Sequence, residues 1–227
     1  MTDEQRWTTV DRYLGATLLP ADPVLDSVLT ANAEAGLPPI DVSPLLGKLL
    51  YLLARAVSAN SVLEIGTLGG YSTIWLARAV APGGRVVTLE VDQERAAVAR
   101  GNLRRAGLAD AVEIRVGRAL DTLPQLAAGA ADSGAPFDFI FVDADKASMP
   151  QYVEWALRLS RPGTLILCDN IVRGGAVADP DSGDASVIGA RSCIDMLAAD
   201  PRVSATAIQT VGSKGHDGFA LALVTTV

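Results

Sequence analysis

The chain has 227 residues, of which 49% are hydrophobic, and it carries a formal net charge of −7 at pH 7. A chain of this length can bury a substantial hydrophobic core. The acidic balance argues against a nucleic-acid surface or a patch for anionic membranes, because both need clustered Lys and Arg. The two cysteines, Cys168 and Cys193, have no paired spacing, so neither a disulfide framework nor a zinc site is indicated. Without an export signal or a membrane-length apolar run, we expect a cytoplasmic protein with small-molecule or protein partners.

Residues 1–58 have helical patterns and precede the first predicted strand. Their most apolar part is DVSPLLGKLLYLLARAV, in which Ser43 is a candidate N-cap and Pro44 the first helical residue. We expect one domain over residues 1–227, with a helical cap (1–58) on an α/β core (59–227).

Seven short runs of β-branched and apolar residues predict strands. They are residues 61–65, 85–90, 111–116, 137–143, 164–169, 203–209 and 218–224. Helical periodicity between the early strands, as in 93–107, predicts a doubly wound, mostly parallel α/β sheet. The short link between the last two strands suits an antiparallel hairpin. Residues 127–136 and 177–186 are small or polar and are predicted to be surface loops.

Ligands of such sheets bind beyond the carboxyl ends of the strands. The first strand is followed by EIGTLGGYS (64–72), where glycines allow close approach of a ligand and a helix N-terminus favours anionic groups. The spacing does not satisfy the dinucleotide fingerprint G-x-G-x-x-G, and the turn alone is equally compatible with a purely geometric role. Glu64, however, would attract a cationic ligand.

The second and third strands end at Glu90 and Gly117. An acid at the end of a second strand commonly accepts hydrogen bonds from a ribose, and the loop after Gly117 could offer backbone groups to an adenine edge. A nucleoside joined to a cationic centre would satisfy the first three strand ends together.

Oxygen-bearing side chains end the fourth and fifth strands, at Asp143 and at the pair Asp169 and Asn170. Neighbouring parallel strands lie about 4.8 Å apart, so these side chains can converge. Two carboxylates and an amide oxygen suit Mg²⁺, Mn²⁺ or Ca²⁺. Lys146 follows the fourth strand, and a nearby divalent cation would disfavour its charged form, which makes it a candidate general base. The ordinary alternative is a surface lysine.

A calcium-binding loop in DADKASMPQYVE (143–154) is disfavoured. Ser148 stands where such a loop needs glycine, and an apolar strand precedes the segment where a helix is required. For Asp145 alone, a solvated charge at the strand end is the default interpretation.

The motifs LEIGTLGGYS, FVDADK and CDN, in this order, resemble the cation-dependent class I O-methyltransferases that use S-adenosylmethionine, the family of catechol and caffeoyl-coenzyme A O-methyltransferases. The resemblance runs over nearly the whole chain. It implies a seven-stranded Rossmann-like methyltransferase sheet with an antiparallel last strand, and methyl transfer to a phenolic or catechol-like small-molecule hydroxyl. It also implies a divalent cation, Mg²⁺ before Ca²⁺ or Mn²⁺, and a homodimer paired through the N-terminal helices.

Carried over residue by residue, the resemblance implies three sets of site residues. The cofactor would contact Val42, Glu64, Gly66, Ser72, Glu90, Gly117, Ala119 and Asp143. Ile40, beside Val42, would lie in a segment that covers the cofactor. The metal would be held by Asp143, Asp169 and Asn170, and the catalytic centre would consist of Asp143 and Lys146, with Lys146 as base. No role follows for Asp145, Arg173, Cys168 or His216, and residues 177–186 are either a substrate lid or a linker.

Other functions are compatible with a doubly wound sheet. A nicotinamide-dependent oxidoreductase is disfavoured by the failed glycine fingerprint and by the lack of a Tyr-x-x-x-Lys pair, since Tyr152 is followed by Ala156. A non-catalytic protein that binds S-adenosylmethionine or metal would keep the fold without the activity. The combination of Asp143, Lys146 and the Asp169–Asn170 pair favours an enzyme. Nucleic-acid methylation is disfavoured by the acidic balance.

Overall fold

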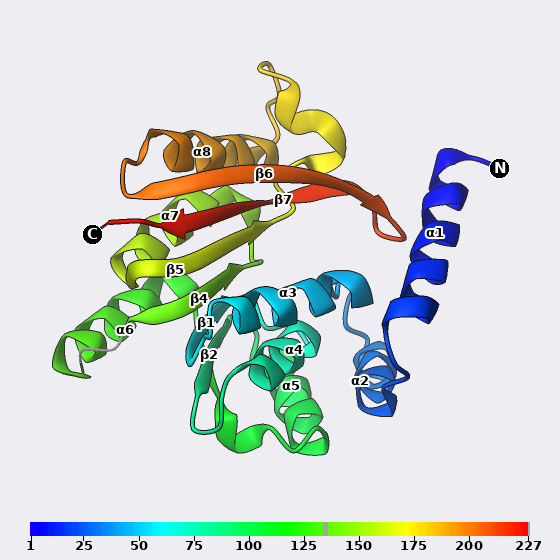
Figure 1. Ribbon diagram of the computed structural model, residues 1–227, viewed down its shortest axis with the longest axis horizontal. Helices are drawn as coiled ribbons and strands as arrows, with labels where there is room; N and C mark the ends of the chain where they lie inside the picture. The colour runs from blue at the N-terminus through cyan, green and yellow to red at the C-terminus, as the bar shows by residue number, and fades with distance from the viewer. Residues whose placement is uncertain (134–135, 227) are drawn as a thin grey trace.

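The computed structural model describes residues 1–133 and 136–226. Seven strands form one sheet in the order β3-β2-β1-β4-β5-β7-β6 (Figure 1). They are β1 (Ser61–Ile65), β2 (Arg85–Glu90), β3 (Val112–Val116), β4 (Phe137–Val142), β5 (Ser160–Asp169), β6 (Val203–Gly212) and β7 (Gly215–Val224). The first five strands pair in parallel, and β7 is antiparallel to both β5 and β6. The predicted doubly wound, mostly parallel sheet with an antiparallel last strand is confirmed.

Helices cover both faces of this sheet (Figure 1). One face carries α3 (Pro44–Ala56), α4 (Tyr71–Ala79) and α5 (Gln93–Arg105), and α2 (Pro23–Glu34) packs on the last two. The other face carries α6 (Ala119–Ser133), α7 (Met149–Arg158) and α8 (Ala185–Ala199). Short 3-10 helices complete the chain, namely η1 (Ala109–Ala111), η2 (Lys146–Ser148) and η3 (Arg173–Ala178).

The central strand β4 is apolar on both sides because both sides are buried. Phe139 and Phe141 pack with Leu50 of α3 in one hydrophobic cluster, whereas Ile140 packs with Val153 of α7 in the other. Side chains along a strand alternate between the two faces, so the apolar run from Phe139 to Val142 supplies both clusters. This buried strand ends at the polar sequence that begins with Asp143.

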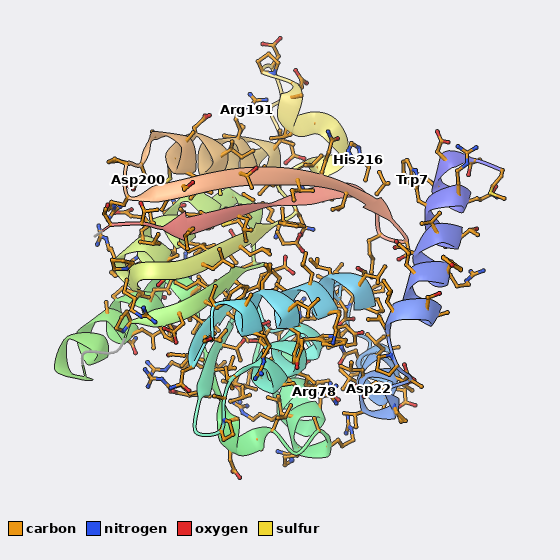
Figure 2. The ribbon with its side chains drawn as sticks, in the orientation of Figure 1. Trp7, Asp22, Arg78, Arg191, Asp200 and His216 are labelled. Carbon is orange, nitrogen blue, oxygen red and sulfur yellow. The ribbon has the colours of Figure 1, made fainter. Side chains whose placement is uncertain are left out.

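The N-terminal helices begin where their capping residues predict. Ser43 Oγ accepts the backbone N–H of Leu46 at 3.2 Å and Pro44 is the first residue of α3, as expected. Arg78 of α4 forms an ion pair with Asp22, the N-cap of α2 (Figure 2). No helix in the described part of the chain is long and apolar enough to span a membrane.

Helix α1 (Asp3–Leu18) lies beside the β6–β7 hairpin at the edge of the molecule (Figure 1). It has no buried residue. Its specific contact with the hairpin comes from Asp11, whose Oδ2 accepts the backbone N–H of Ser213 at 2.7 Å. A Cβ atom on Gly212 would meet the same carboxylate at 2.4 Å, so the close approach of α1 depends on glycine at this turn.

Two loop predictions need correction. Residues 127–133 continue α6 and are not a loop, because the alanine-rich sequence favours helix despite its small residues, and residues 134 and 135 lie outside the described residues. The predicted link between the last two strands is mostly strand, since pairing continues to Gly212 and Gly215. Of the predicted loop 177–186, residues 179–184 do form a largely exposed loop, whereas residues 177–178 belong to η3 and residues 185–186 to α8.

Candidate active site

Two cavities open beyond the carboxyl ends of the strands. The first has a volume of about 690 Å³ and is lined by residues that follow β1, β2, β3 and β4. The second, of about 540 Å³, is lined by residues 39–49, the β6–β7 hairpin and the end of β5. The cavities share Ile40, Asp41, Val42, Asp143, Asn170 and Arg173. A molecule in one cavity can therefore meet a molecule in the other beside these shared side chains.

The turn after β1 brings the ends of β1 and β4 together. Gly66 has a φ of 107°, and a Cβ atom there would lie 2.1 Å from the carbonyl oxygen of Asp143. The N–H of Asp143 donates to the carbonyl of Ile65 at 2.8 Å. Only glycine fits this backbone and this approach. The turn after β1 and the first predicted metal ligand are therefore held side by side.

Glu64 lies beneath the first cavity and is fully buried. Its carboxylate accepts hydrogen bonds from Ser72 Oγ at 2.6 Å, from Thr88 Oγ1 at 2.7 Å and from Thr73. Burial raises the pKa of Glu64 to about 7 against the opposing effect of these hydroxyls. Among the predicted cofactor residues, all of which the structure describes, Glu64 is the one that does not line the first cavity. Glu64 accepts a hydrogen bond from Ser72, which does line the cavity. A role of Glu64 toward the cofactor stays a prediction.

All the other predicted cofactor residues line the first cavity. They are Val42, Gly66, Ser72, Glu90, Gly117, Ala119 and Asp143, and the neighbouring Ile40 lines it too. Glu90 is fixed at the cavity wall, because its two oxygens accept the backbone N–H groups of Leu68 at 2.8 Å and Asp92 at 3.0 Å. A carboxylate oxygen has more than one acceptor site, so Glu90 can still accept hydrogen bonds from hydroxyls of a ligand.

Four polar side chains gather where β4 and β5 end. Lys146 is buried, and its Nζ lies 2.7 Å from Asp143 Oδ1. Asp169 is 5% exposed, and its Oδ1 accepts the backbone N–H of Asn170 at 2.8 Å. Burial, followed by the negative charge of Asp143, raises the pKa of Asp169 to about 7. Asp143, Asp169 and Asn170 all line the second cavity, as the adjacent positions of β4 and β5 predict.

This donor set fits a divalent cation. Burial, and then the negative charge of Asp143, disfavours the ionised form of Asp169, and a bound cation would favour that ionised form. Asn170 adds an amide oxygen, so the set consists of hard oxygen ligands suited to Mg²⁺, Mn²⁺ or Ca²⁺. Within residues 1–133 and 136–226, no three His, Cys, Asp or Glu side chains are grouped to hold a metal. The candidate set has two acids, with Asn170 as the third ligand.

Asp145 and Tyr152 support the turn that carries Lys146. Asp145 Oδ2 accepts the backbone N–H of Ser148 at 3.0 Å at the start of η2, and Asp145 Oδ1 accepts the hydroxyl of Tyr152. Burial and the neighbouring carboxylate raise the pKa of Tyr152, so its hydroxyl stays protonated as a donor. Both residues also line the first cavity. The spacing of Asp145 and Ser148 is a capping signal that sequence reasoning did not use.

Arg173 and Asp217 belong to the site but were not predicted. Asp217 lies in β7, and its Oδ1 accepts the backbone N–H groups of Val172, Arg173 and Gly218, each at 3.0 Å. Asp217 therefore fixes the backbone that follows Asn170. No local pattern reveals this role, because the contact joins segments about 45 residues apart.

Cys168 and His216 line neither cavity. Cys168 is buried, and its hydrogen bond with Cys193, together with burial, raises the pKa of its thiol. His216 Nε2 lies 3.1 Å from Gln209 Oε1 on the neighbouring strand. The structure gives neither residue a place in the chemistry.

The strand order, the antiparallel β7 and a cavity at the carboxyl ends define the class of S-adenosylmethionine-dependent methyltransferases. Residues 19–223 match the sequence profile of the O-methyltransferase family, and the chain belongs to that family. The protein is therefore an enzyme that transfers a methyl group from S-adenosylmethionine to an oxygen atom, and the predicted family is confirmed. The oxidoreductase and non-catalytic alternatives are wrong.

Close relatives match the chain over almost its whole length. A catechol O-methyltransferase from Mycobacterium tuberculosis is 55% identical over 215 residues, which cover 95% of this chain and 94% of that protein. The solved O-methyltransferase from Bacillus cereus in complex with S-adenosylhomocysteine is 56% identical and has a TM-score of 0.94, covering 97% of this chain and 99% of that one.

The O-methyltransferase TomG from Streptomyces achromogenes, involved in tomaymycin synthesis and solved with S-adenosylmethionine, is 52% identical. Its TM-score is also 0.94, with 99% of this chain and 100% of that chain covered. Two structural relatives above half identity thus contain the methyl donor or its product, which supports the predicted cofactor.

Proposed function

We propose that this enzyme methylates a hydroxyl of a catechol-like phenol and that a divalent cation, most simply Mg²⁺, takes part. The observation that carries the proposal is the convergence of Asp143, Asp169 and Asn170 beside Lys146, at the place where the two cavities meet. The printed name of the Mycobacterium tuberculosis relative, catechol O-methyltransferase, supports the same substrate class.

In this proposal the first cavity holds S-adenosylmethionine and the second holds the phenol. The cofactor would contact Val42, Gly66, Ser72, Glu90, Gly117, Ala119 and Asp143. Glu90 would accept hydrogen bonds from the ribose, and Glu64 would act from beneath, by fixing Ser72. The reacting groups would then meet at the shared wall, which includes Ile40 and Val42.

When bound, the cofactor supplies an electrophilic methyl group and the cation favours ionisation of a phenol beside it. Asp143, Asp169 and Asn170 would hold that cation. Lys146, as the neutral amine, would accept the phenolic proton at Nζ, because Nζ lies 2.7 Å from Asp143, which lines both cavities. Holding both reactants in line contributes on the order of 7–11 kcal/mol to lowering the barrier.

The experiment is a methylation assay with a panel of catechols, S-adenosylmethionine and Mg²⁺, repeated after exhaustive treatment with EDTA. We expect turnover that disappears with EDTA and returns with Mg²⁺ or Mn²⁺. Turnover that is insensitive to EDTA would remove the cation from the proposal. Absence of methylation on every phenol, with the cofactor still bound by calorimetry, would remove the substrate class.

We further propose that the enzyme is a cytoplasmic homodimer that binds neither nucleic acid nor membranes. Helix α1 buries none of its residues in the single chain, its side chains Val10, Tyr13 and Leu18 are exposed, and the helix contacts β6, where Val211 is exposed too. Packing of these apolar side chains against a second surface would stabilise the helix. Light scattering should give twice the chain mass of 23.6 kDa, and a monomeric mass would contradict the dimer.

A further inference from the structure

Asp41 brings a carboxylate without a counter-charge to the junction of the two cavities. It is one of two acids that line both cavities, and the other, Asp143, is paired with Lys146. Among residues 1–133 and 136–226, no ion pair includes Asp41. Lys214, which lines the second cavity, donates instead to the carbonyl of Pro39 at 2.9 Å. The charge of Asp41 is therefore left for a ligand to balance.

A buried network of amide side chains fixes the carboxylate of Asp41. Asn32, which is 2% exposed, donates from Nδ2 to Asp41 Oδ1 at 2.9 Å. Its own Oδ1 accepts Nδ2 of Asn102 at 2.9 Å, and this amide also donates to the carbonyl of Gly69 at 2.7 Å. The network joins α2, α5 and the turn after β1 (Figure 1). Asp41 is thus a fixed part of the cavity wall, because satisfied buried networks hold a single arrangement.

The network engages one oxygen of Asp41. The bond from Asn32 ends on Oδ1, and the described residues give Oδ2 no hydrogen bond. Burial raises the pKa of Asp41, against the opposing effects of the bond from Asn32 and of the charge of Lys214. A positive charge on a ligand beside this half-buried carboxylate would offset the cost of burying it.

The methyl donor carries such a charge at its reacting atom. The sulfur of S-adenosylmethionine is a sulfonium cation. After methyl transfer the electron pair of the broken carbon–sulfur bond stays on sulfur, so S-adenosylhomocysteine has a neutral thioether. In the proposed function this sulfur lies at the wall that both cavities share. Asp41 would face a positive charge there before the reaction and none after it.

We propose that Asp41 determines specificity for the charged form of the cofactor, by favouring the sulfonium of S-adenosylmethionine over the thioether of S-adenosylhomocysteine. The inference rests on the placement of the cofactor in the proposed function, and it needs neither the phenol nor the cation. Its consequence is that the spent cofactor loses a contact with the cavity wall when its charge disappears. Asp41 thereby limits inhibition by the product.

The test is calorimetry of the full chain with three ligands, without phenol or metal. The ligands are S-adenosylmethionine, S-adenosylhomocysteine and sinefungin, which carries a protonated amine in place of the methylated sulfur. Asp41→Asn removes the charge and keeps an oxygen for Asn32. Its affinity for the two cations should fall about three- to tenfold relative to its affinity for S-adenosylhomocysteine, as expected for one unit charge several ångströms away.

A matched variant separates this effect from a general change of charge. Asp26→Asn removes one negative charge from the exposed surface of α2, at a residue that lines neither cavity, and should leave the three affinities in their wild-type ratio. Equal affinity losses for all three ligands in Asp41→Asn, or no loss, would overturn the inference. The same selective loss in Asp26→Asn would overturn it too.

A third variant distinguishes this inference from the proposed function. Glu90→Gln should weaken all three ligands, because all three carry the same ribose. If it weakens none, the placement of the cofactor in the first cavity fails and the inference fails with it. If it weakens all three and Asp41→Asn is not selective, only the assignment of Asp41 fails. Lack of turnover on every phenol would remove the proposed substrate class and leave the selectivity of Asp41 in place.

Discussion

The Nζ atom of Lys146 lies 2.7 Å from Oδ1 of Asp143, and the two residues are separated by a single turn that follows β4. Lys146 is 8% exposed. The carbonyl of Lys146 also lies against α8, since a Cβ atom on Gly189 would meet it at 1.9 Å. The backbone of Lys146 is therefore held by α8 and its amine by Asp143.

Replacement of Lys146 by alanine tests its proposed role as base. We expect Lys146→Ala to lower kcat about 10²- to 10⁴-fold, the usual contribution of a general base, with little change in the dissociation constant for S-adenosylhomocysteine. Lys146→Arg keeps the positive charge without a readily deprotonated group and should be similarly slow. Steady-state kinetics and calorimetry provide the two measurements. A variant as fast as the wild type would exclude Lys146.

Removal of one carboxylate tests the cation site. Asp169→Asn keeps the shape of the side chain but halves the negative charge of the candidate ligand set, so the Mg²⁺ concentration for half-maximal activity should rise about tenfold or more. Asp169 does not line the first cavity, so affinity for S-adenosylhomocysteine should be unchanged. A metal titration with the same midpoint as wild type would argue against Asp169 as a ligand.

The buried carboxyl group of Glu64 predicts a pH dependence of stability. Its pKa is raised from 4.5 to about 7, so the folded protein keeps a proton that the unfolded chain releases between these values. The contribution of Glu64 to stability therefore decreases as pH rises through this window. The free energy of unfolding of the wild type minus that of Glu64→Gln should fall by on the order of 2–3 kcal/mol between about pH 5 and pH 7.5.

Urea denaturation of the cofactor-free proteins at several pH values gives this difference. Other titrating groups, Asp169 among them, are present in both proteins and cancel. A difference that stays constant with pH would mean that Glu64 is ionised in the folded state throughout this range.

The turn at Gly66 can be tested by a matched pair of glycine substitutions. Gly66→Ala places a methyl group against the Asp143 carbonyl at a φ of 107°, and should destabilise the protein by about 2 kcal/mol or more. Gly101→Ala lies inside α5, with no atom closer than 3.8 Å, and should be neutral or stabilising by about 0.5–1 kcal/mol. Chemical denaturation measures both, and similar effects in the two variants would contradict the close approach.

Much of the fold follows from local sequence. The apolar runs predict the strands, and polar residues after β4 and β5 predict where a site can form, because parallel strands end at the same edge. Residues 127–133 were misread as a loop, since small residues occur in both loops and helices and the helix propensity of the alanines was given too little weight.

The site was less predictable than the fold. Asp143, Asp169 and Asn170 follow adjacent strands, so their convergence could be inferred from strand order. The roles of Asp217 and Arg173 depend on β7 lying between β5 and β6, which brings distant residues together. The position of Glu64 beneath the cavity depends on three hydroxyl groups from two other elements, which sequence spacing does not reveal.

The most direct test of a cation at the junction of the two cavities is a crystal structure of the enzyme grown with S-adenosylhomocysteine and Mn²⁺. We predict an anomalous peak within coordination distance, about 2.0–2.6 Å, of oxygen atoms of Asp143, Asp169 and Asn170. S-adenosylhomocysteine should lie in the cavity beside Gly66 and Glu90. A structure with S-adenosylhomocysteine bound there and no anomalous peak at these three residues would contradict the account.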